Sequence, residues 1–452
     1  MEDRLRVLKD INESKKLNEI NTKVCIFGQG FVGLPLALSF ALRGCSVVGV
    51  DVDDVLVGNI NKGITHHLEK FHGVTIVEIL QMQLEDRRYV ATTDSGKAVR
   101  GCNNIIVTVG IPIKNGDFIM DHLEDACRNI GRNLKKDDLV IIRSTVIPGT
   151  TEDFVLPILE SESGMKAGID FYLAYASERI AEGNAFEEFA NMVTLVGGVN
   201  EASLYRAMDL LRVVCKAEVI AASGIKEVET AKVFENIQRD VNIAMSQEFA
   251  RFTEALGIDI TEVIKLANTH KRVNLLIPGA GVGGYCIPNA YHYLAPKAEE
   301  FGLNMGLLKL ARSKNARVPE FIVDKTEELL EQVGKKLKGS KIAVLGLAMK
   351  DYSNDDRNSP PMDICKILID RGANIRAFDP MVQEGYKFKR STQDEALNGA
   401  DAVLILTKQQ DINFNDVYGM SQKMNDSPVC IDAKAAIDRE EALKYGFVYW
   451  RI

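Results

Sequence analysis

One stretch near the N-terminus reads Val24-Cys25-Ile26-Phe27-Gly28-Gln29-Gly30-Phe31-Val32-Gly33, an apolar run followed by glycines at the spacing G-x-G-x-x-G. The apolar run predicts a buried strand, and residues 34–42 predict the helix that follows the turn. A second strand is predicted over residues 46–50 and ends at Asp51. In this context the glycines permit a tight turn and a close backbone approach to a pyrophosphate at the helix N-terminus. The stretch therefore predicts a dinucleotide-binding α/β domain.

The position of Asp51, 23 residues after Gly28, indicates which dinucleotide binds. An acidic side chain at the end of the second strand can accept hydrogen bonds from the adenosine ribose hydroxyls, and it repels a 2′-phosphate. NAD is therefore favoured over NADP. The alternative, a glycine-rich turn that serves packing alone, is disfavoured by the strand–turn–helix context. The cofactor residues predicted here are Gly28, Gly30, Phe31, Val32, Gly33 and Asp51.

Strand and helix patterns alternate in two separate parts of the chain. Further strands are predicted at 104–109, 139–142, 171–174 and 193–196, and then again at 341–346, 374–378, 402–406 and 429–432. Such alternation indicates parallel, doubly wound sheets. The predicted fold is α/β, with two Rossmann-like doubly wound domains joined by a central helical domain. The predicted domains are an N-terminal extension (1–22), a NAD-binding domain (23–212), a central helical domain (213–333) and a second Rossmann-like domain (334–452).

The central domain contains one long helical pattern, residues 225–256, without proline or internal glycine. Glu229, Lys232, Asn236 and Arg239 recur at helical spacing, so they are predicted to share one face. The helix is interpreted either as a dimerisation element of a homodimer or higher homo-oligomer, or as a helix that packs only within its own chain.

Composition excludes several classes of protein. The formal net charge is −8, which argues against non-specific binding of nucleic acid. The chain has neither a membrane-spanning apolar run nor a signal-peptide core, so no membrane association is expected. The eight cysteines are scattered without a C-x-x-C pair. Seven are interpreted as buried thiols of a reduced, cytoplasmic protein, and neither disulfides nor a metal site is expected.

The eighth cysteine stands in a glycine-rich segment, Gly281-Val282-Gly283-Gly284-Tyr285-Cys286-Ile287-Pro288. A cysteine flanked by glycines and a proline is predicted to lie in a loop. Glycines allow the backbone to approach a ligand closely, and a loop cysteine near cations can act as a thiolate nucleophile. From this segment alone, an inert loop thiol is an equally good interpretation.

Seven segments together resemble the UDP-glucose/GDP-mannose dehydrogenase family from about residue 23 to residue 450. They stand in the family's order, and their number makes the resemblance more specific than any single motif. The segments are residues 28–35, 143–151, 177–183, 235–244, 283–288, 346–350 and 355–360.

The resemblance implies a four-electron oxidation of the C6 hydroxyl of a UDP-sugar to a carboxylate with two NAD, through an aldehyde and a thioester. It implies that Cys286 is the nucleophile and that Lys232 and Asn236 stabilise the oxyanion. It also implies that Glu178, Glu182 and Thr145 orient or activate the water, and that Thr145 and Arg357 contact the cofactor. The substrate residues it implies are Arg179, Ile180, Lys232, Asn236, Arg239, His270, Arg272, Gly283 and Lys350, the last from the UDP-sugar-binding second Rossmann-like domain.

The sugar is suggested by Arg179, which directly follows Glu178 and resembles the branch of the family that acts on UDP-N-acetylhexosamines. UDP-N-acetylmannosamine is the expected substrate, followed by UDP-N-acetylglucosamine and then UDP-glucose. A non-catalytic nucleotide-sugar binding protein on a decayed scaffold is the alternative from a different class. A 6-phosphogluconate or 3-hydroxyacid dehydrogenase is disfavoured by the α/β domain that starts at Lys341.

The chain departs from the family pattern at two positions. The family usually has aspartate four residues after the cysteine, whereas this chain has Ala290. Asn289 and His292 are nearby candidates to substitute for that acid, and histidine is suited to base work. The first hydride transfer is expected to survive, while hydrolysis of the thioester is expected to be slow or to use His292. The second departure is Ile111, where the family often has threonine near the cofactor.

Overall fold

The computed structural model describes residues 22–114, 117–180 and 183–452. The chain divides into two compact units, Met1–Phe234 with His292–Lys297 and Glu235–Tyr291 with Ala298–Ile452. Each unit is built on one large sheet. The predicted N-terminal extension lies outside the described residues except for Thr22.

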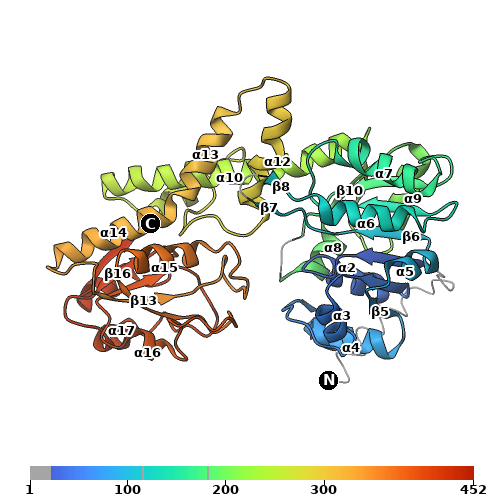
Figure 1. The fold of residues 1–452 in the computed structure, drawn as a ribbon. Helices are drawn as coiled ribbons and strands as arrows, with labels where there is room; N and C mark the ends of the chain where they lie inside the picture. Colours follow the sequence, from blue (N-terminus) through green and yellow to red (C-terminus); the bar gives the residue numbers. More distant parts are fainter. Residues whose placement is uncertain (1–21, 115–116, 181–182) are drawn as a thin grey trace. The chain divides into compact units, whose positions relative to one another are not determined.

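The first unit contains an eight-stranded sheet in the order β12-β11-β10-β9-β6-β1-β2-β5 (Figure 1). The strands are β1 (Lys23–Phe27), β2 (Ser46–Val50), β5 (Tyr89–Thr92), β6 (Asn104–Val107), β9 (Leu139–Ile142), β10 (Tyr172–Ala176), β11 (Thr194–Gly198) and β12 (Val219–Ala221). Two small hairpins are formed by β3 (Lys70–Phe71) with β4 (Val74–Thr75) and by β7 (Ile113–Lys114) with β8 (Asp117–Phe118).

The sheet differs from the predicted all-parallel arrangement at one pair, because β10 and β11 run antiparallel. The apolar pattern identified β11, but strand direction is set by the way in which residues 177–193 return to the sheet. Strands β5 and β12 were not predicted, and both are short strands at the edges of the sheet. Strand β12 continues the first sheet to Ala221, beyond residue 212, where the NAD-binding domain was predicted to end. The domain boundaries proposed from the sequence stay a prediction.

Both faces of the first sheet are covered by helices, which explains the continuous apolar character of its central strands. In β1, Val24 and Ile26 belong to one core, whereas Cys25 and Phe27 belong to the other. The helices are α2 (Gly33–Ala41), α3 (Asp54–Ile60), α4 (Ile76–Glu85), α5 (Ser95–Gly101), α6 (Asp121–Gly131), the π-helix η1 (Thr151–Val155), α7 (Leu156–Ser163), α8 (Ala185–Asn191) and α9 (Glu201–Leu211). Residues of α2, α4, α8 and α9 line the first core, and residues of α5, α6 and α7 line the second.

The long helix is confirmed as α10 (Ile225–Leu256), with the bounds that the sequence predicted. Ile225 and Val228 at its start are buried in the second core of the first unit. It is followed by α11 (Ile260–Ala267), α12 (Cys286–Glu300), α13 (Gly306–Ala316) and α14 (Val318–Gln332).

The second unit contains a parallel five-stranded sheet in the order β14-β13-β15-β16-β17. Its strands are β13 (Lys341–Leu345), β14 (Asn374–Phe378), β15 (Ala402–Ile405), β16 (Val429–Asp432) and β17 (Val448–Arg451), of which β17 was not predicted. Its helices are α15 (Pro360–Asp370), α16 (Gln393–Leu397), α17 (Val417–Lys423) and α18 (Arg439–Lys444). Helices α14 and α15 cover one face, and α16 and α17 cover the other (Figure 1). The predicted fold class is confirmed.

The burial predicted for seven of the cysteines is also confirmed. All eight cysteines are free, seven of them are buried, and Cys286 is exposed. Over the described parts of the chain, no helix has both the length and the apolar character needed to cross a membrane.

Candidate active site

The glycine turn after β1 is shaped for a ligand at one of its three glycines. A Cβ on Gly28 would lie 3.2 Å from the backbone of Thr108, and a Cβ on Gly33 would lie 1.7 Å from the Gly28 carbonyl oxygen. Gly28 also has a φ of +85°, which favours glycine. Gly30 is exposed, and a Cβ there would meet nothing within 4 Å. Gly28 and Gly33 therefore close the turn, while Gly30 faces open space that a pyrophosphate can approach.

Asp51 is held at the end of β2 by backbone groups. Its Oδ2 accepts a hydrogen bond from the Gln29 N–H at 2.7 Å, and its Oδ1 accepts one from the Asp53 N–H at 3.1 Å. No side chain caps the start of α2 at Val32. The Leu34 N–H donates to the Gly30 carbonyl oxygen at 3.2 Å, and Pro35 has no N–H, so a ligand would meet the N–H groups before Leu34 and the partial positive charge of the helix. Phe31 and Val32 are half-buried beside it. These observations fit NAD, whose ribose and pyrophosphate need an acid and a helix N-terminus.

Glu178 follows β10 and is tightly bound within its own unit. Its Oε2 accepts a hydrogen bond from Arg143 Nε at 2.6 Å, and its Oε1 accepts the N–H groups of Arg179 and Ile180 at 2.7 and 2.8 Å. The Glu178 carboxylate is buried. In this conformation it organises the start of the segment 178–183, and removal of a proton from water would compete with these bonds. Glu182 lies outside the described residues.

Arg179 and Ile180 extend from the same point. Arg179 Nη1 donates to the Val193 carbonyl oxygen at 2.9 Å, and Ile180 packs against the first core. Both side chains are half-buried. The polypeptide therefore fixes part of Arg179, the residue whose position suggested the sugar.

Glu229 connects the turn that carries Thr145 to helix α10. Its Oε2 accepts the Gly149 N–H at 2.5 Å, and its Oε1 accepts the Thr151 N–H at 2.9 Å. Burial raises the pKa of Glu229 above its ordinary value, although the hydrogen bonds from Thr151 and Gly149 act in the opposite direction. From the sequence, Glu229 was predicted only to share a helical face with Lys232, without a role of its own. Its spacing of three residues before Lys232 was the available signal.

Lys232 is buried one helical turn after Glu229, and Thr145 is half-buried in the turn that Glu229 holds. Both belong to the first unit, which also contains the glycine turn. The carboxyl ends of β1, β9 and β10 thus contribute the turn, Thr145 and Glu178 along one edge of the sheet. Ile111, the second departure from the family, is buried, and its carbonyl oxygen accepts the Tyr293 hydroxyl at 3.1 Å.

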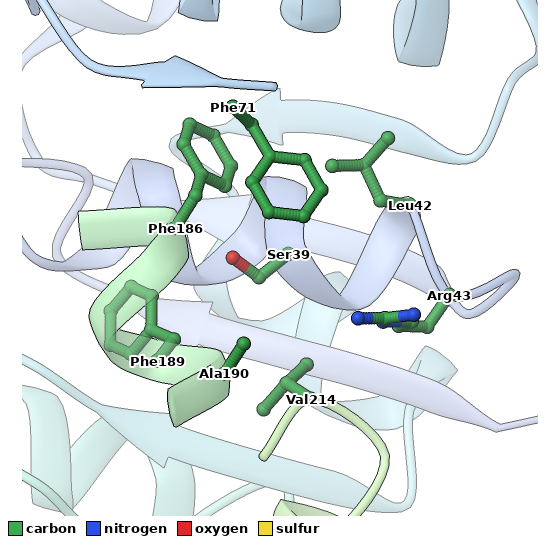
Figure 2. A pocket seen from close by; sticks show the side chains of 8 residues that line it. All are labelled: Ser39, Leu42, Arg43, Phe71, Phe186, Phe189, Ala190 and Val214. Atoms are coloured by element: carbon green, nitrogen blue, oxygen red, sulfur yellow. The ribbon is translucent and has the colours of Figure 1, made fainter. Parts of the chain in front are cut away.

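A small apolar pocket also lies in the first unit, at the end of α2 remote from the glycine turn (Figure 2). It is lined by Ser39, Leu42, Arg43, Phe71, Phe186, Phe189, Ala190 and Val214. These residues join the C-terminal end of α2 to α8, so the pocket is part of the packing between the two helices, and none of the predicted site residues lines it.

Asn236 and Arg239 continue along α10 into the second unit. Asn236 is buried, and its Nδ2 has no hydrogen-bond partner among the described residues. Arg239 is exposed, whereas the neighbouring Asp240 is buried against Arg312 at 2.9 Å. Asn236 therefore offers a free amide donor, which suits a bond to a substrate oxygen.

His270 and Arg272 lie in the exposed segment after α11. The Arg272 N–H donates to His270 Nδ1 at 3.3 Å. Both side chains are available to an anionic ligand, and arginine can bind a phosphate through two parallel hydrogen bonds.

The loop position predicted for Cys286 is wrong, because Cys286 is the first residue of α12 and is exposed there. The three residues before it complete the turn into the helix. A helix N-terminus presents unpaired N–H groups and a partial positive charge. Negative charge on the sulfur, or on an oxyanion beside it, is therefore stabilised by the start of α12. The sequence pattern of glycines and Pro288 indicated a turn but not the helix that starts within it.

The segment before Cys286 packs on the segment that follows β13, within the second unit. The Gly284 N–H donates to the Asn358 carbonyl oxygen at 3.2 Å. A Cβ on Gly283 would lie 2.6 Å from Pro360 Cδ and 2.7 Å from the Asn358 carbonyl oxygen. Gly283 is therefore required because a side chain there would collide with Pro360 and Asn358. The sequence alone had indicated only that glycines in this segment allow the backbone to approach a ligand.

Replacement of Gly283 with alanine is expected to lower the free energy of unfolding by about 1–3 kcal/mol, because overpacking displaces backbone and proline atoms that have no free rotation. The same change should reduce turnover, since Cys286 lies three residues further. Thermal unfolding and steady-state rates measure both effects. Gly279→Ala is the matched control, because its Cβ would meet no atom nearer than 3.8 Å. Equal behaviour of the two variants would contradict the packing role.

Lys350 and Arg357 lie in the same segment after β13. Arg357 pairs with Asp355 at 2.6 Å, and its guanidinium lies 5.4 Å from the centroid of the Tyr285 ring. Lys350 is half-buried. Arg357 thus stands next to the residue that precedes Cys286.

Ala290 is almost fully buried in the first turns of α12. It lies four residues after Cys286 and Asn289 lies three, so both share the helical face of Cys286. His292 lies six residues after Cys286, about 120° away around the helix. The helix therefore favours Asn289 over His292 as the polar neighbour of the sulfur.

His292→Ala is accordingly expected to change turnover by less than about twofold, because a side chain on another helical face is not directed at the thioester. Steady-state NADH production measures this. Asn289→Ala is the comparison variant, and a large loss in His292→Ala alone would show that the histidine acts in hydrolysis after all.

The glycine turn, Asp51 and the covering of both sheet faces define a Rossmann-type dehydrogenase that uses NAD. Family models of the UDP-glucose/GDP-mannose dehydrogenase family match in order: the NAD binding domain over residues 22–215, the central domain over 226–317 and the UDP binding domain over 343–439. Among the described residues, no cluster of three metal-binding side chains occurs.

Individual relatives agree with these matches. The UDP-N-acetyl-D-mannosamine dehydrogenase of Pyrococcus horikoshii is 33% identical over 427 residues, covering 94% of this chain and 98% of the relative. The UDP-N-acetyl-D-glucosamine 6-dehydrogenase of Pseudomonas aeruginosa is 32% identical over 363 residues, covering 80% and 83%. A solved structure of the UDP-D-ManNAc dehydrogenase from Pyrococcus horikoshii has a TM-score of 0.88 at 33% identity, covering 95% of this chain and 99% of that chain.

The chain belongs to the UDP-glucose/GDP-mannose dehydrogenase family. It is an NAD-dependent UDP-sugar dehydrogenase, as the resemblance implied, and the alternative of a non-catalytic binding protein is not retained.

Proposed function

We propose that the enzyme oxidises C6 of UDP-N-acetylmannosamine to the carboxylate. The observation that carries the proposal is the exposed Cys286 at the N-terminus of α12, directly after a segment in which Tyr285 lies against Arg357 and Gly284 is bonded to Asn358. Relatives named for UDP-N-acetylmannosamine, and Arg179 directly after Glu178, favour this sugar. UDP-N-acetylglucosamine is the second candidate, because one relative carries that name.

In the proposed reaction, Gly28, Gly30, Gly33 and Asp51 would hold the pyrophosphate and ribose of NAD, which would supply the hydride acceptor for each of two oxidations. Lys232 and Asn236 donate to the C6 oxygen and stabilise its negative charge. This shared role is supported by the burial of Lys232 and by Asn236, whose Nδ2 has no hydrogen-bond partner among the described residues.

Cys286 then bonds to C6 of the aldehyde through its sulfur, giving a thiohemiacetal, and the second oxidation leaves a thioester on the same sulfur. Water adds to the thioester, the carbon–sulfur bond breaks, and the carboxylate leaves with the thiol restored. Thr145 and Glu182 are proposed to orient this water. Glu178 is proposed to hold the segment that contains Glu182, since its own oxygens already accept three hydrogen bonds.

A substrate panel tests the proposal. UDP-N-acetylmannosamine, UDP-N-acetylglucosamine and UDP-glucose are each incubated with excess NAD, and NADH absorbance and product mass are recorded. The expected result is the highest kcat/KM with UDP-N-acetylmannosamine, two NADH per sugar and a uronate product. A higher kcat/KM with either other sugar would overturn the assignment, and one NADH per sugar would show that the reaction stops at the aldehyde.

We further propose that the enzyme is a homodimer joined through α10. Met245, Phe249, Phe252 and Leu256 are exposed at helical spacing on its second half. Exposed apolar side chains that follow one helical face are typical of an interface. The enzyme is proposed to work in the cytoplasm, where Cys286 stays reduced.

Phe252→Glu is expected to convert the dimer to a monomer, because a charge in an apolar interface is desolvated without a partner. Sedimentation at several protein concentrations gives the mass. Tyr418→Glu, an exposed aromatic on α17, is the control and should leave the mass unchanged. A Phe252→Glu protein with wild-type mass would place the interface elsewhere.

A further inference from the structure

Glu69 is a buried carboxylate of the first unit that none of the roles above includes. Its side chain is 1% exposed, and it lies directly before β3. Its Oε1 accepts a hydrogen bond from the Gly183 N–H at 3.1 Å. Gly183 directly follows Glu182 in the sequence and has a φ of +95°, so a backbone that favours glycine is held by a buried acid. Glu69 therefore holds the backbone of Gly183, whereas Glu178 holds the backbone of Arg179 and Ile180.

A second contact joins the same two parts of the chain. Phe71 and Phe186 pack with their ring centroids 5.7 Å apart, and Figure 2 shows the two rings side by side. Glu69 and Phe71 are two residues apart, as are side chains on one side of an extended segment. Residues 69–71 thus contact residues 183–186 at two points, one polar and one apolar.

On its other side, Glu69 is linked to the cofactor turn through His67. His67 is buried, and its Nδ1 lies 3.6 Å from Glu69 Oε2. The Phe31 ring of the glycine turn lies edge-on to His67, with centroids 5.0 Å apart. His66 stacks on His67 at 4.6 Å and also contacts Phe31. One continuous set of contacts therefore runs from Phe31 through His67 and Glu69 to Gly183.

The charge of Glu69 distinguishes this arrangement from ordinary packing. Burial opposes ionisation, but the contacts with His67 and the Gly183 N–H outweigh it, so the pKa of Glu69 lies below its usual range. Glu69 is thus a carboxylate at neutral pH. An apolar side chain would fill the same space without the free-energy cost of a buried charge, whereas it would leave the Gly183 N–H unpaired.

We propose that Glu69, supported by His67, is a positioning residue that couples the cofactor turn to the acidic segment used in thioester hydrolysis. The hydrolytic part rests on the proposed function. Release of Gly183 would shift the backbone next to Glu182 and slow hydrolysis, while loss of support beneath Phe31 would weaken binding of NAD.

The test uses Glu69→Ala and Glu69→Gln in the full-length enzyme. Intact mass of the acid-quenched protein during turnover reports the sugar adduct on Cys286, and titration calorimetry without sugar reports the Kd for NAD. We expect Glu69→Ala to accumulate the adduct, with hydrolysis slowed about 10-fold or more, because a hydrogen bond to a charged group is lost. The Kd for NAD should rise about threefold, a smaller change than that in the hydrolysis rate. Glu69→Gln keeps an oxygen for the Gly183 N–H and should restore most of the hydrolysis rate.

Lys70→Ala, which changes the exposed neighbour of Glu69, is the control and should match wild type. The proposal is overturned if Glu69→Ala folds with wild-type melting, shows no adduct and binds NAD normally. It is also overturned if the adduct is absent and every rate falls in parallel with stability, as a purely structural role predicts. If the wild type oxidises no UDP-sugar, the proposed function fails instead, and the effect on NAD binding still tests the coupling.

Discussion

Cys286→Ala is expected to abolish formation of the carboxylate, with a loss of about 10⁴-fold or more, because removal of a nucleophile leaves only binding and orientation. The variant should still exchange hydride slowly with an added aldehyde, since Lys232, Asn236 and the cofactor turn are unchanged. Product mass and NADH yield measure the two activities separately. Cys286 lies at the start of α12, where the helix stabilises the negative charge that the reaction places on sulfur and oxygen. Loss of the sulfur therefore also removes the group that benefits from this position.

Cys365→Ala is the control for this variant, because Cys365 is buried in α15 of the same unit and is not in the site. Alkylation gives an independent measurement. One equivalent of iodoacetamide should modify the folded enzyme at Cys286, since the other seven thiols are buried. Full acid production by Cys286→Ala would remove this cysteine from the mechanism.

Lys232→Met is expected to lower kcat by about 10²–10³-fold with little change in KM, because a donor to a developing oxyanion acts mainly in the transition state. The substitution keeps the length and the apolar stem of the side chain. Lys232 is buried one turn after Glu229, which anchors the Thr145 turn on the same helix. Stopped-flow measurement of the first NADH formed separates the first oxidation from later steps.

Lys226→Met is the matched control on α10, since Lys226 is exposed and pairs with Asp153 at 3.1 Å. Exposed ion pairs contribute little to stability, so its kcat should stay within about twofold of wild type. A rise in KM without a fall in kcat for Lys232→Met would show that Lys232 binds the ground state and does not stabilise the transition state.

The elements that could be predicted are those specified by short-range pattern. Strand β1, the glycine turn and helix α2 follow from an apolar run, three glycines and a helical stretch. Helix α10 was predicted to the residue because 32 positions lack both proline and glycine. The burial of seven cysteines was predicted from their scatter and apolar surroundings.

Other features depended on partners far apart in the chain. The direction of β11 could not be predicted, because an apolar strand has the same pattern in either direction. The anchoring of Glu178 by Arg143 joins residues that follow two different strands. The contact of Glu69 with Gly183 spans more than one hundred residues, so no local spacing indicates it.

The opening stretch, residues 24–33, and Asp51 were enough by themselves to predict a NAD-binding α/β fold, because a glycine turn between a strand and a helix has few other uses. The ordered motifs were enough to indicate the family and the nucleophile. Only the tertiary structure decided that Cys286 starts a helix, that Gly283 is required by packing on Pro360, and that Glu229 and Glu69 hold backbone rather than substrate. The physical reason is that a buried carboxylate is stable only where distant N–H groups meet it, and the fold alone brings those groups together.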